Sequence, residues 1–227
     1  LAHHGVLFLD ELLEFRRNVL EVLRQPLEDG VVTLSRAALT VTYPARFQLV
    51  AAMNPCPCGH YGDPARTCLC SPDRIRAYRA RMSGPLYDRI DLHLRVAAVP
   101  WQEVASHEEG ESSRAVAERV AGARGRQRER FRGRSTTNAG MTSREIDWWC
   151  RPDADGRRLL GAAMSRLGWS ARGYSRVLKV ARTIADLEGE EQVRGPHLAE
   201  AIQYRILDRP TAAAPDRRGV GAGTRPA

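Results

Sequence analysis

The stretch that decides the fold is residues 5–12, which read GVLFLDEL. Its four consecutive apolar residues, 6–9, predict a short strand buried on both faces, as in a parallel sheet. Two carboxylates, Asp10 and Glu11, follow directly where this strand ends. This is the Walker B pattern, in which the first carboxylate holds Mg²⁺ against nucleotide phosphates and the second orients the attacking water. Because acidic pairs also follow strands that end in ordinary loops, the pattern needs support from elsewhere in the chain.

A second apolar strand supplies part of that support. Residues 47–53 read FQLVAAM and are followed by Asn54. In ATPases of this layout the strand beside the Walker B strand ends in a sensor residue, and Asn54 is placed to help position the hydrolytic water. The alternative is that Asn54 and Pro55 simply begin a turn.

Two arginines are candidates for contacts with nucleotide phosphate. Arg89 lies at a predicted helix end between Asp88 and Asp91. It either pairs with these carboxylates or acts as an arginine finger, which stabilises the transition-state charge on a neighbouring subunit's γ-phosphate. Arg172 lies near the start of a long predicted helix, where a phosphate approaches the helix N-terminus. Its alternative is a solvated surface arginine.

The remaining pattern of residues 1–100 is that of alternating strands and helices. Apolar spacing predicts an amphipathic helix over 14–27 that stops near Pro26. Residues 31–34 and 39–43 predict a hairpin, and the alternation over 90–99 predicts a last strand. Arg36 is expected near the hairpin tip, where it either follows DNA phosphates or is a solvated turn residue.

The rest of the chain changes character. Residues 101–140 are polar and arginine-rich, and predict a linker helix interrupted at Gly122, Gly125 and Gly133. Its arginines either add non-specific affinity for nucleic acid or form a solvated face. Residues 141–209 predict an all-helical domain, and the tail at 210–227 has a composition typical of disorder. Strands feeding helices, followed by a helical bundle, indicate an α/β domain with a helical lid. The four predicted helices cover 142–150, 156–167, 170–188 and 195–208.

Four of the five cysteines form a compact group. Cys56 and Cys58 make one C-x-C pair and Cys68 and Cys70 a second, nine residues later, with glycines between them. Four thiolates on a short loop can close a tetrahedral structural zinc site that leaves no open position for catalysis. The spacing within each pair is tighter than the usual two to four residues, and free thiols are the alternative.

Composition excludes several classes of protein. The chain has 227 residues, a formal charge of +8 and no apolar run of the length needed to span a membrane. Its first residues lack the pattern of a secretory signal, and clustered cysteines in a reducing compartment bind metal more often than they form disulfides. A cytoplasmic location is expected.

Taken together, these motifs resemble the magnesium-chelatase-like AAA+ ATPases of the competence-protein ComM branch. The resemblance rests on residues 1–12, 34–36, 42–55, 83–92, 110–113 and 178–187. It implies an α/β fold made of the C-terminal half of an AAA+ P-loop core over residues 1–100, followed by the linker and the helical lid. It also implies ATP and Mg²⁺ as cofactors, a ring hexamer of this chain, and movement along DNA in recombination or natural transformation, with branch migration as the activity. The roles it implies are Walker B for Asp10 and Glu11, sensor 1 for Asn54, a finger acting in trans for Arg89, and sensor 2 for Arg172.

One departure from the family pattern stands out. The sequence contains no G-x-x-x-x-G-K-[ST] phosphate-binding loop, and Lys179 is its only lysine. We therefore expect the chain to be the C-terminal part of a longer protein and to be inactive in ATP hydrolysis by itself. Two other functions stay open, namely a chelatase-type ATPase subunit that remodels a protein partner, and a non-catalytic, zinc-containing interaction module.

Overall fold

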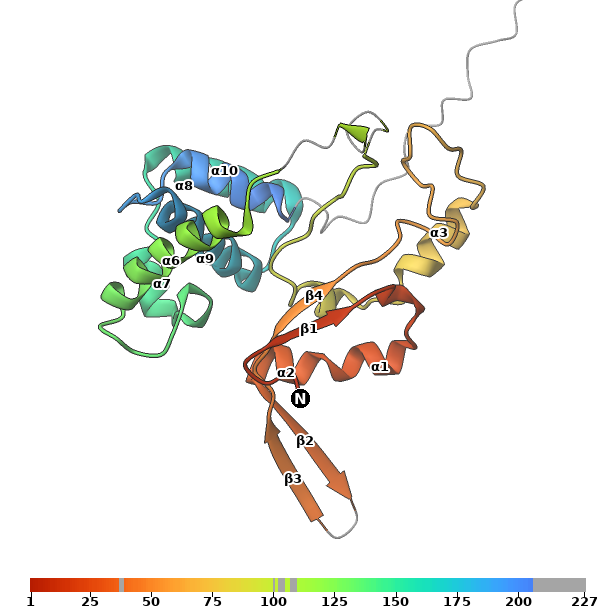
Figure 1. The fold of residues 1–227 in the computed structure, drawn as a ribbon, viewed down its shortest axis with the longest axis horizontal. Helices are drawn as coiled ribbons and strands as arrows, with labels where there is room; N and C mark the ends of the chain where they lie inside the picture. The colour runs from red at the N-terminus through yellow and green to blue at the C-terminus, as the bar shows by residue number, and fades with distance from the viewer. Residues whose placement is uncertain (37–38, 100, 102–104, 107–109, 206–227) are drawn as a thin grey trace, which may run out of the picture.

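The computed structural model describes residues 1–36, 39–99, 101, 105–106 and 110–205. Its elements form a strand-containing first region and a helical second region (Figure 1). The first region contains β1 (Val6–Leu9), a 3₁₀ turn (Leu12–Glu14), α1 (Arg17–Val22), α2 (Arg24–Asp29), β2 (Val31–Arg36), β3 (Leu39–Pro44), β4 (Gln48–Ala51), α3 (Pro72–Arg79) and α4 (Gly84–Tyr87). The second contains α6 (Ser113–Arg130), a 3₁₀ turn (Asn138–Gly140), α7 (Ser143–Trp149), α8 (Ala154–Leu167), α9 (Ala171–Glu188) and α10 (Gly195–Gln203).

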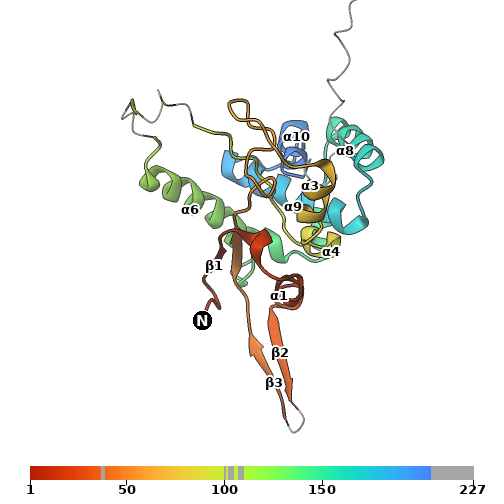
Figure 2. The same ribbon diagram turned by 90° about the vertical axis from the view of Figure 1, so that its right-hand side faces the viewer.

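The strand predicted at 6–9 is β1, and it pairs in parallel with β4. The expectation that it is buried on both faces is wrong, because Val6 and Phe8 on one face are exposed and no described element covers them. The register joins Val6 to Gln48 and Leu9 to Ala51, so the carboxyl ends of both strands lie at one edge. The hairpin is also present, with β2 and β3 antiparallel over six residue pairs. Figures 1 and 2 show this hairpin projecting away from the remainder of the protein.

The helix predicted over 14–27 is divided into α1 and α2 and extends past Pro26 to Asp29. Pro26 does not stop it, because it occupies the first turn of α2, where a backbone N–H has no partner within the helix. Gly30 ends α2 in the left-handed conformation, at φ 69°.

The last strand expected at 90–99 is a wrong prediction. These residues are extended but unpaired with any strand among those that the structure describes. Instead, the N–H of His93 donates to the carbonyl of Tyr204 at 2.8 Å. This hydrogen bond ties the segment to the helical region. Alternation of apolar and polar residues predicts a strand, but it does not show whether a neighbouring strand is present to pair with it.

The linker helix is longer than its glycines suggested. α6 runs unbroken through Gly122 and Gly125, and only Gly133, at φ 72°, lies beyond its end. Each glycine costs a helix roughly 1 kcal/mol, and packing of Ala123 and Gln127 on α9 offsets this cost.

The helical region has its own core. Fourteen buried apolar residues from α7, α8, α9, α10 and the adjoining loops pack together, including Val177, Ala181 and Leu198. The helices expected at 142–150, 156–167 and 170–188 correspond to α7, α8 and α9. The fourth corresponds to α10, which ends at Gln203 and is followed by turn residues 204 and 205, whereas 206–208 and the tail at 210–227 lie outside the described residues. None of the described helices combines the length and apolar character needed to cross a membrane.

Candidate functional site

Parallel pairing of β1 with β4 gathers three of the predicted site residues at one edge of the sheet. Asp10 and Glu11 directly follow β1, and Asn54 follows β4 by three residues. Backbone bonds lock the two chain segments together there, because Ala52 donates to Leu9 at 2.9 Å and Leu12 donates to Ala52 at 2.8 Å. The side chains of Asp10, Glu11 and Asn54 are all exposed at this edge.

The backbone at the acidic pair is unusual. Glu11 has φ 49° and ψ 45°, a left-handed conformation that costs a residue with a side chain about 1–2 kcal/mol. The carboxylate of Asp10 accepts a hydrogen bond from the Glu11 N–H at 2.9 Å, which helps to hold this turn. The exposed oxygens of Asp10 and Asn54 are of the kind that Mg²⁺ prefers. The edge therefore fits a magnesium ion held between protein and phosphate.

Arg89 lies just after α4, and its guanidinium is turned inward. It donates to the carbonyl of Pro85 at 2.6 Å and forms an ion pair with Glu28 at the end of α2. The side chain is only 11% exposed. Its ion-pair partner is Glu28 and not Asp88 or Asp91, the neighbours considered from the sequence, and Asp91 instead pairs with Arg176.

Arg172 approaches the same carboxylate from the helical region. It lies in the first turn of α9, is 76% exposed, and has a guanidinium nitrogen 3.5 Å from Glu28. The pKa of Glu28 is lowered, first by the hydrogen bond from Arg89 and further by the charges of Arg89 and Arg172, while desolvation opposes the shift. Two predicted phosphate-binding arginines therefore meet at one anionic group.

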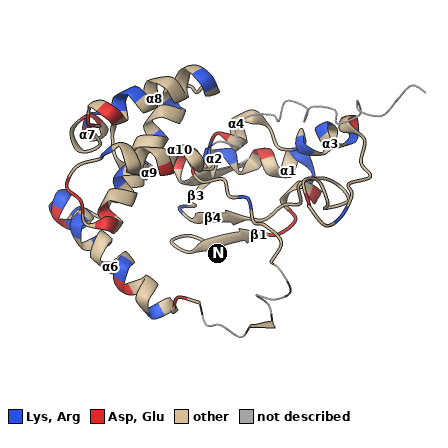
Figure 3. Ribbon diagram, turned by 90° about the horizontal axis from the view of Figure 1, so that it is seen from above, with Lys and Arg blue, Asp and Glu red and all other residues tan. Residues whose placement is uncertain are grey.

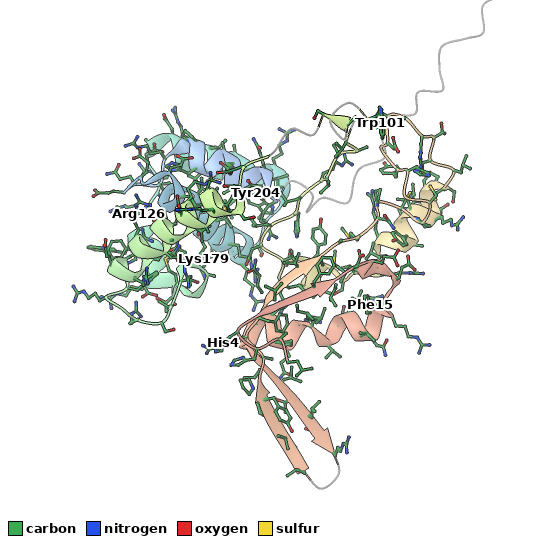
Figure 4. The ribbon with its side chains drawn as sticks, in the orientation of Figure 1. His4, Phe15, Trp101, Arg126, Lys179 and Tyr204 are labelled. Atoms are coloured by element: carbon green, nitrogen blue, oxygen red, sulfur yellow. The ribbon has the colours of Figure 1, made fainter. Side chains whose placement is uncertain are left out.

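This arginine pair lies at the opposite end of β1 from the carboxylates. Gly30, which ends α2 two residues after Glu28, accepts a hydrogen bond from Ala45, and the next residue, Arg46, accepts one from His4. Figure 4 shows His4 and Phe15 at opposite ends of the layer formed by β1 and α1. The chain thus carries acidic groups at one end of this layer and arginines at the other.

Sequence reasoning missed Glu28 and Arg176. Glu28 is one of 27 acidic residues and has no motif around it. Arg176 follows Arg172 by four residues, so both project from one face of α9. That spacing is the sequence signal by which Arg176 could have been found.

Arg36 is the last residue of β2, is exposed, and lies next to the hairpin tip, whose residues 37 and 38 are outside the described part. One face of the hairpin carries hydroxyl groups in cross-strand contact, Thr33 with Thr42 and Ser35 with Thr40, each at 3.2 Å. The register places Arg36 on the other face, opposite Leu39.

The four clustered cysteines come together as predicted. Their sulfur atoms all lie within 4.8 Å of one another. The Sγ atom of Cys58 is 3.4 Å from that of Cys56 and 3.5 Å from that of Cys68, and the Sγ atoms of Cys56 and Cys68 are 3.7 Å apart. A tetrahedral zinc ion with Zn–S bonds of about 2.3 Å requires its sulfurs to be about 3.8 Å apart. The arrangement fits that requirement.

The loop also favours a thiolate at Cys58. Backbone N–H groups of His60 and Leu69 lower the pKa of Cys58 to about 6. The N–H of Cys70 acts on Cys68 in the same direction, but burial and the neighbouring thiols outweigh it and raise the pKa of Cys68 to about 12. The loop thus favours the thiolate form of Cys58, which is the form in which cysteine binds a metal ion.

The arginine-rich α6 divides into two halves. Its first half is exposed, with Arg114 paired to Glu118 and Arg119 to Glu111, so its charges are partly neutralised (Figure 3). In the second half, Arg126 donates to the backbone carbonyl of Asp186 in α9, and Arg130, whose side chain is only 9% exposed, pairs with the carboxylate of Asp186. These two arginines therefore stabilise the packing of α6 on α9.

The sequence was compared with known proteins. Residues 1–104 match the family model for magnesium chelatase, subunit ChlI, and residues 110–205 match the model for the C-terminal part of that subunit. The competence protein ComM of Haemophilus influenzae is 49% identical over 211 residues, and the uncharacterized protein YifB of Salmonella typhimurium is 47% identical over the same length. Each match covers 92% of this chain and 40% of the relative. The chain thus spans well under half the length of these relatives.

Proposed function

Because the chain belongs to the magnesium-chelatase-like AAA+ family, we propose that it is part of an ATPase that couples ATP hydrolysis to DNA remodelling of the helicase or branch-migration type. One observation carries the proposal: Asp10, Glu11 and Asn54 share one edge of the β1–β4 sheet, whereas Arg89 and Arg172 meet at the other end. The activity belongs to the complete protein, since the chain spans 40% of its relatives.

At the acidic edge, Asp10 binds Mg²⁺, and Glu11 accepts a proton from the attacking water or orients it. Asn54 gives that water a second hydrogen-bonding partner. The magnesium ion, when bound, neutralises charge on the β- and γ-phosphates of ATP. The fixed parallel register keeps all three side chains in place during the reaction.

The arginines act across a boundary between subunits. A head-to-tail ring, with a hexamer as the expected form, places the arginine end of one chain against the acidic edge of the next. Arg89 then stabilises charge on the γ-phosphate in the transition state, and Arg172 supplies a second positive group. Separation of the two ends within one chain supports action in trans.

DNA is the proposed substrate because of the projecting hairpin. Arg36 on one face of the hairpin, and the hydroxyl groups of Thr33, Ser35 and Thr40 on the other, are each suited to contacts with a phosphate backbone, and such contacts carry no sequence information. The net charge of +8 also favours binding to the negatively charged backbone of DNA. The hairpin is joined through Gly30 to α2, which carries Glu28, the partner of Arg89 and Arg172, and this connection is the proposed link between nucleotide and DNA.

We propose a structural zinc ion at Cys56, Cys58, Cys68 and Cys70. It closes the loop that follows Asn54, and so fixes the end of β4. Native mass spectrometry of the chain should show one zinc ion, lost in Cys70→Ser and retained in Cys150→Ala, the variant of the buried cysteine outside the cluster. A metal-free parent chain purified without chelator contradicts this site.

A second candidate function is that of a chelatase-type ATPase that remodels a protein partner. It is favoured by the description of the two family models. The two functions differ in their response to DNA.

The test is ATP hydrolysis by the complete protein as its gene encodes it, with and without DNA. We expect DNA to stimulate the rate, Glu11→Gln to abolish it, and Arg36→Ala to weaken both DNA binding and stimulation. Arg158→Ala, on the exposed face of α8, is the matched control. An unchanged rate with DNA, together with normal DNA binding by Arg36→Ala, contradicts the proposal and favours the protein-remodelling function. The isolated 227-residue chain is expected to show no turnover, because it has no phosphate-binding loop.

A further inference from the structure

The surroundings of Arg89 differ from those of a structural arginine. Arg182 in α9 is such a residue: it is 1% exposed and bonds to Asp186 and to the carbonyls of Glu190 and Glu191. Arg89 is nearly as enclosed, yet its buried Nε has no hydrogen-bond partner among the described residues. Its guanidinium is therefore held from one side only, by Pro85 and Glu28.

The backbone of Arg89 is held by the helical region. Nη1 of Arg176, in α9, donates to the carbonyl of Arg89 at 2.7 Å and to the carboxylate of Asp91 at 2.5 Å. Next to it, Arg205 donates to the carbonyl of Ile90 at 2.8 Å. Two arginines from the helical region thus bind consecutive carbonyls, 87 and 115 residues away in the sequence.

We propose that Arg176 is a positioning residue for Arg89. It ties the backbone of Arg89 to α9, the helix that also carries Arg172 on the same face. Any movement of α9 therefore moves both arginines together toward or away from the nucleotide of a second copy of this chain. The inference rests on the proposed function, because it presupposes that Arg89 acts on nucleotide.

The residue type suits this task. Nη1 of a guanidinium carries two N–H groups that point in fixed directions, here to a carbonyl and a carboxylate, whereas the three donors of an ammonium group rotate on a flexible stem. Arg176 is 25% exposed at its side chain, whereas Arg205 is 1% exposed. Replacement of Arg176 is therefore compatible with folding, while replacement of Arg205 leaves buried polar groups unpaired.

The first measurement is steady-state ATP hydrolysis by the complete protein. Arg176→Gln should lower kcat about 10- to 100-fold with little change in KM, because a displaced finger weakens only the transition state. Asp91→Asn should have a smaller effect in the same direction, since it keeps the bond from Arg176 to the Arg89 carbonyl. Arg158→Gln, which removes another arginine–aspartate pair of the helical region, should match the parent. A rate for Arg176→Gln within twofold of the parent overturns the proposal.

The second measurement separates positioning from general damage. In mixed rings, subunits with Glu11→Gln still donate Arg89, and subunits with Arg176→Gln still contain the acidic edge. Mixing these two variants should therefore restore activity, whereas mixing Arg176→Gln with Arg89→Ala should not. Recovery in the latter mixture, or a lack of recovery in the former, contradicts the role of Arg176. If Arg89→Ala and Glu11→Gln also fail to complement each other, the proposed function itself fails.

Discussion

The two regions of the chain are built in different ways. The helical region buries fourteen apolar residues in one cluster and encloses an ionic network around Asp186, which is fully buried and bonds to Arg130, Arg182 and Asn138. In the first region, the cluster beneath β1 has only six buried residues. On β1 itself, Val6 and Phe8 are each 59% exposed.

The two regions therefore differ in role: the helical region supports the fold, and the first region provides surfaces for contacts with other molecules. The helical region gathers most of its buried apolar residues in one cluster and pairs the buried charges around Asp186. The first region leaves one face of β1 and β4, the hairpin and both ends of the β1–α1 layer exposed. Exposed apolar surface on a sheet usually marks contact with another protein surface. In the proposed ATPase, these are the surfaces that meet nucleotide, DNA and neighbouring chains.

The largest change in the free energy of unfolding is expected from a substitution in the ionic network around Asp186. Asp186→Ala leaves Arg130 and Arg182 buried without their carboxylate, which should destabilise the helical region by about 3–5 kcal/mol. Urea unfolding followed by tryptophan fluorescence reports this region, because three of the four tryptophans lie in it. Asp155→Ala removes an exposed ion pair on α8 and should change stability by less than about 0.5 kcal/mol. Equal effects of the two substitutions contradict the contrast between the network and the surface.

The next largest loss of stability is expected from truncation of a buried apolar residue in the helical region, compared with truncation of an exposed apolar residue in the first region. Leu198 is fully buried in α10, so Leu198→Ala should cost about 2–5 kcal/mol. Phe8→Ala, which removes a larger but exposed side chain, should change the stability of the isolated chain by less than about 1 kcal/mol. If Phe8→Ala lowers the melting temperature, followed by circular dichroism, more than Leu198→Ala does, β1 is covered in solution. The first region then has a larger buried core than the exposure of β1 indicates.

The smallest expected effect is on the pH dependence of stability, through Glu145 at the start of α7. Glu145 caps this helix together with Thr142 and pairs with Arg134. The side chain of Arg134, followed by the backbone and hydroxyl of Thr142, lowers the pKa of Glu145 to about 2 from 4.5. Because the folded value is the lower one, the stabilisation is present above pH 4.5 and is lost as the pH falls toward 2.

Glu145→Gln should therefore flatten the fall in melting temperature between pH 4.5 and 2. Glu118→Gln, which removes an exposed partner of Arg114, is the control and should leave the slope unchanged. Equal slopes for the parent and Glu145→Gln contradict the capping interaction.

Local features of the fold could be predicted from the sequence. The apolar runs predicted β1 and β4, the paired runs around Arg36 predicted the hairpin, and the helix predicted over 170–188 corresponds to α9. The cysteine spacing placed four sulfurs together, because they are close in the chain. In each case the signal lies within about fifteen residues.

Features that depend on distant residues could not be predicted. The segment at 90–99 alternates like a strand, but pairing is decided by a neighbour that the alternation does not reveal. The contacts of Arg89 with Glu28 and Arg176 join residues 61 and 87 positions apart. With 35 basic residues, nearly all of them arginine, residue type gave no way to select these partners.

The central claim is that the acidic edge and the arginine end act together across a subunit boundary. The most direct measurement is ATP hydrolysis by an equal mixture of Glu11→Gln and Arg89→Ala forms of the complete protein. Each variant alone should be nearly inactive, and random mixing should restore about a quarter of the interfaces, since each active interface needs one particular order of the two subunits. Hydrolysis that stays at the level of the separate variants contradicts the claim.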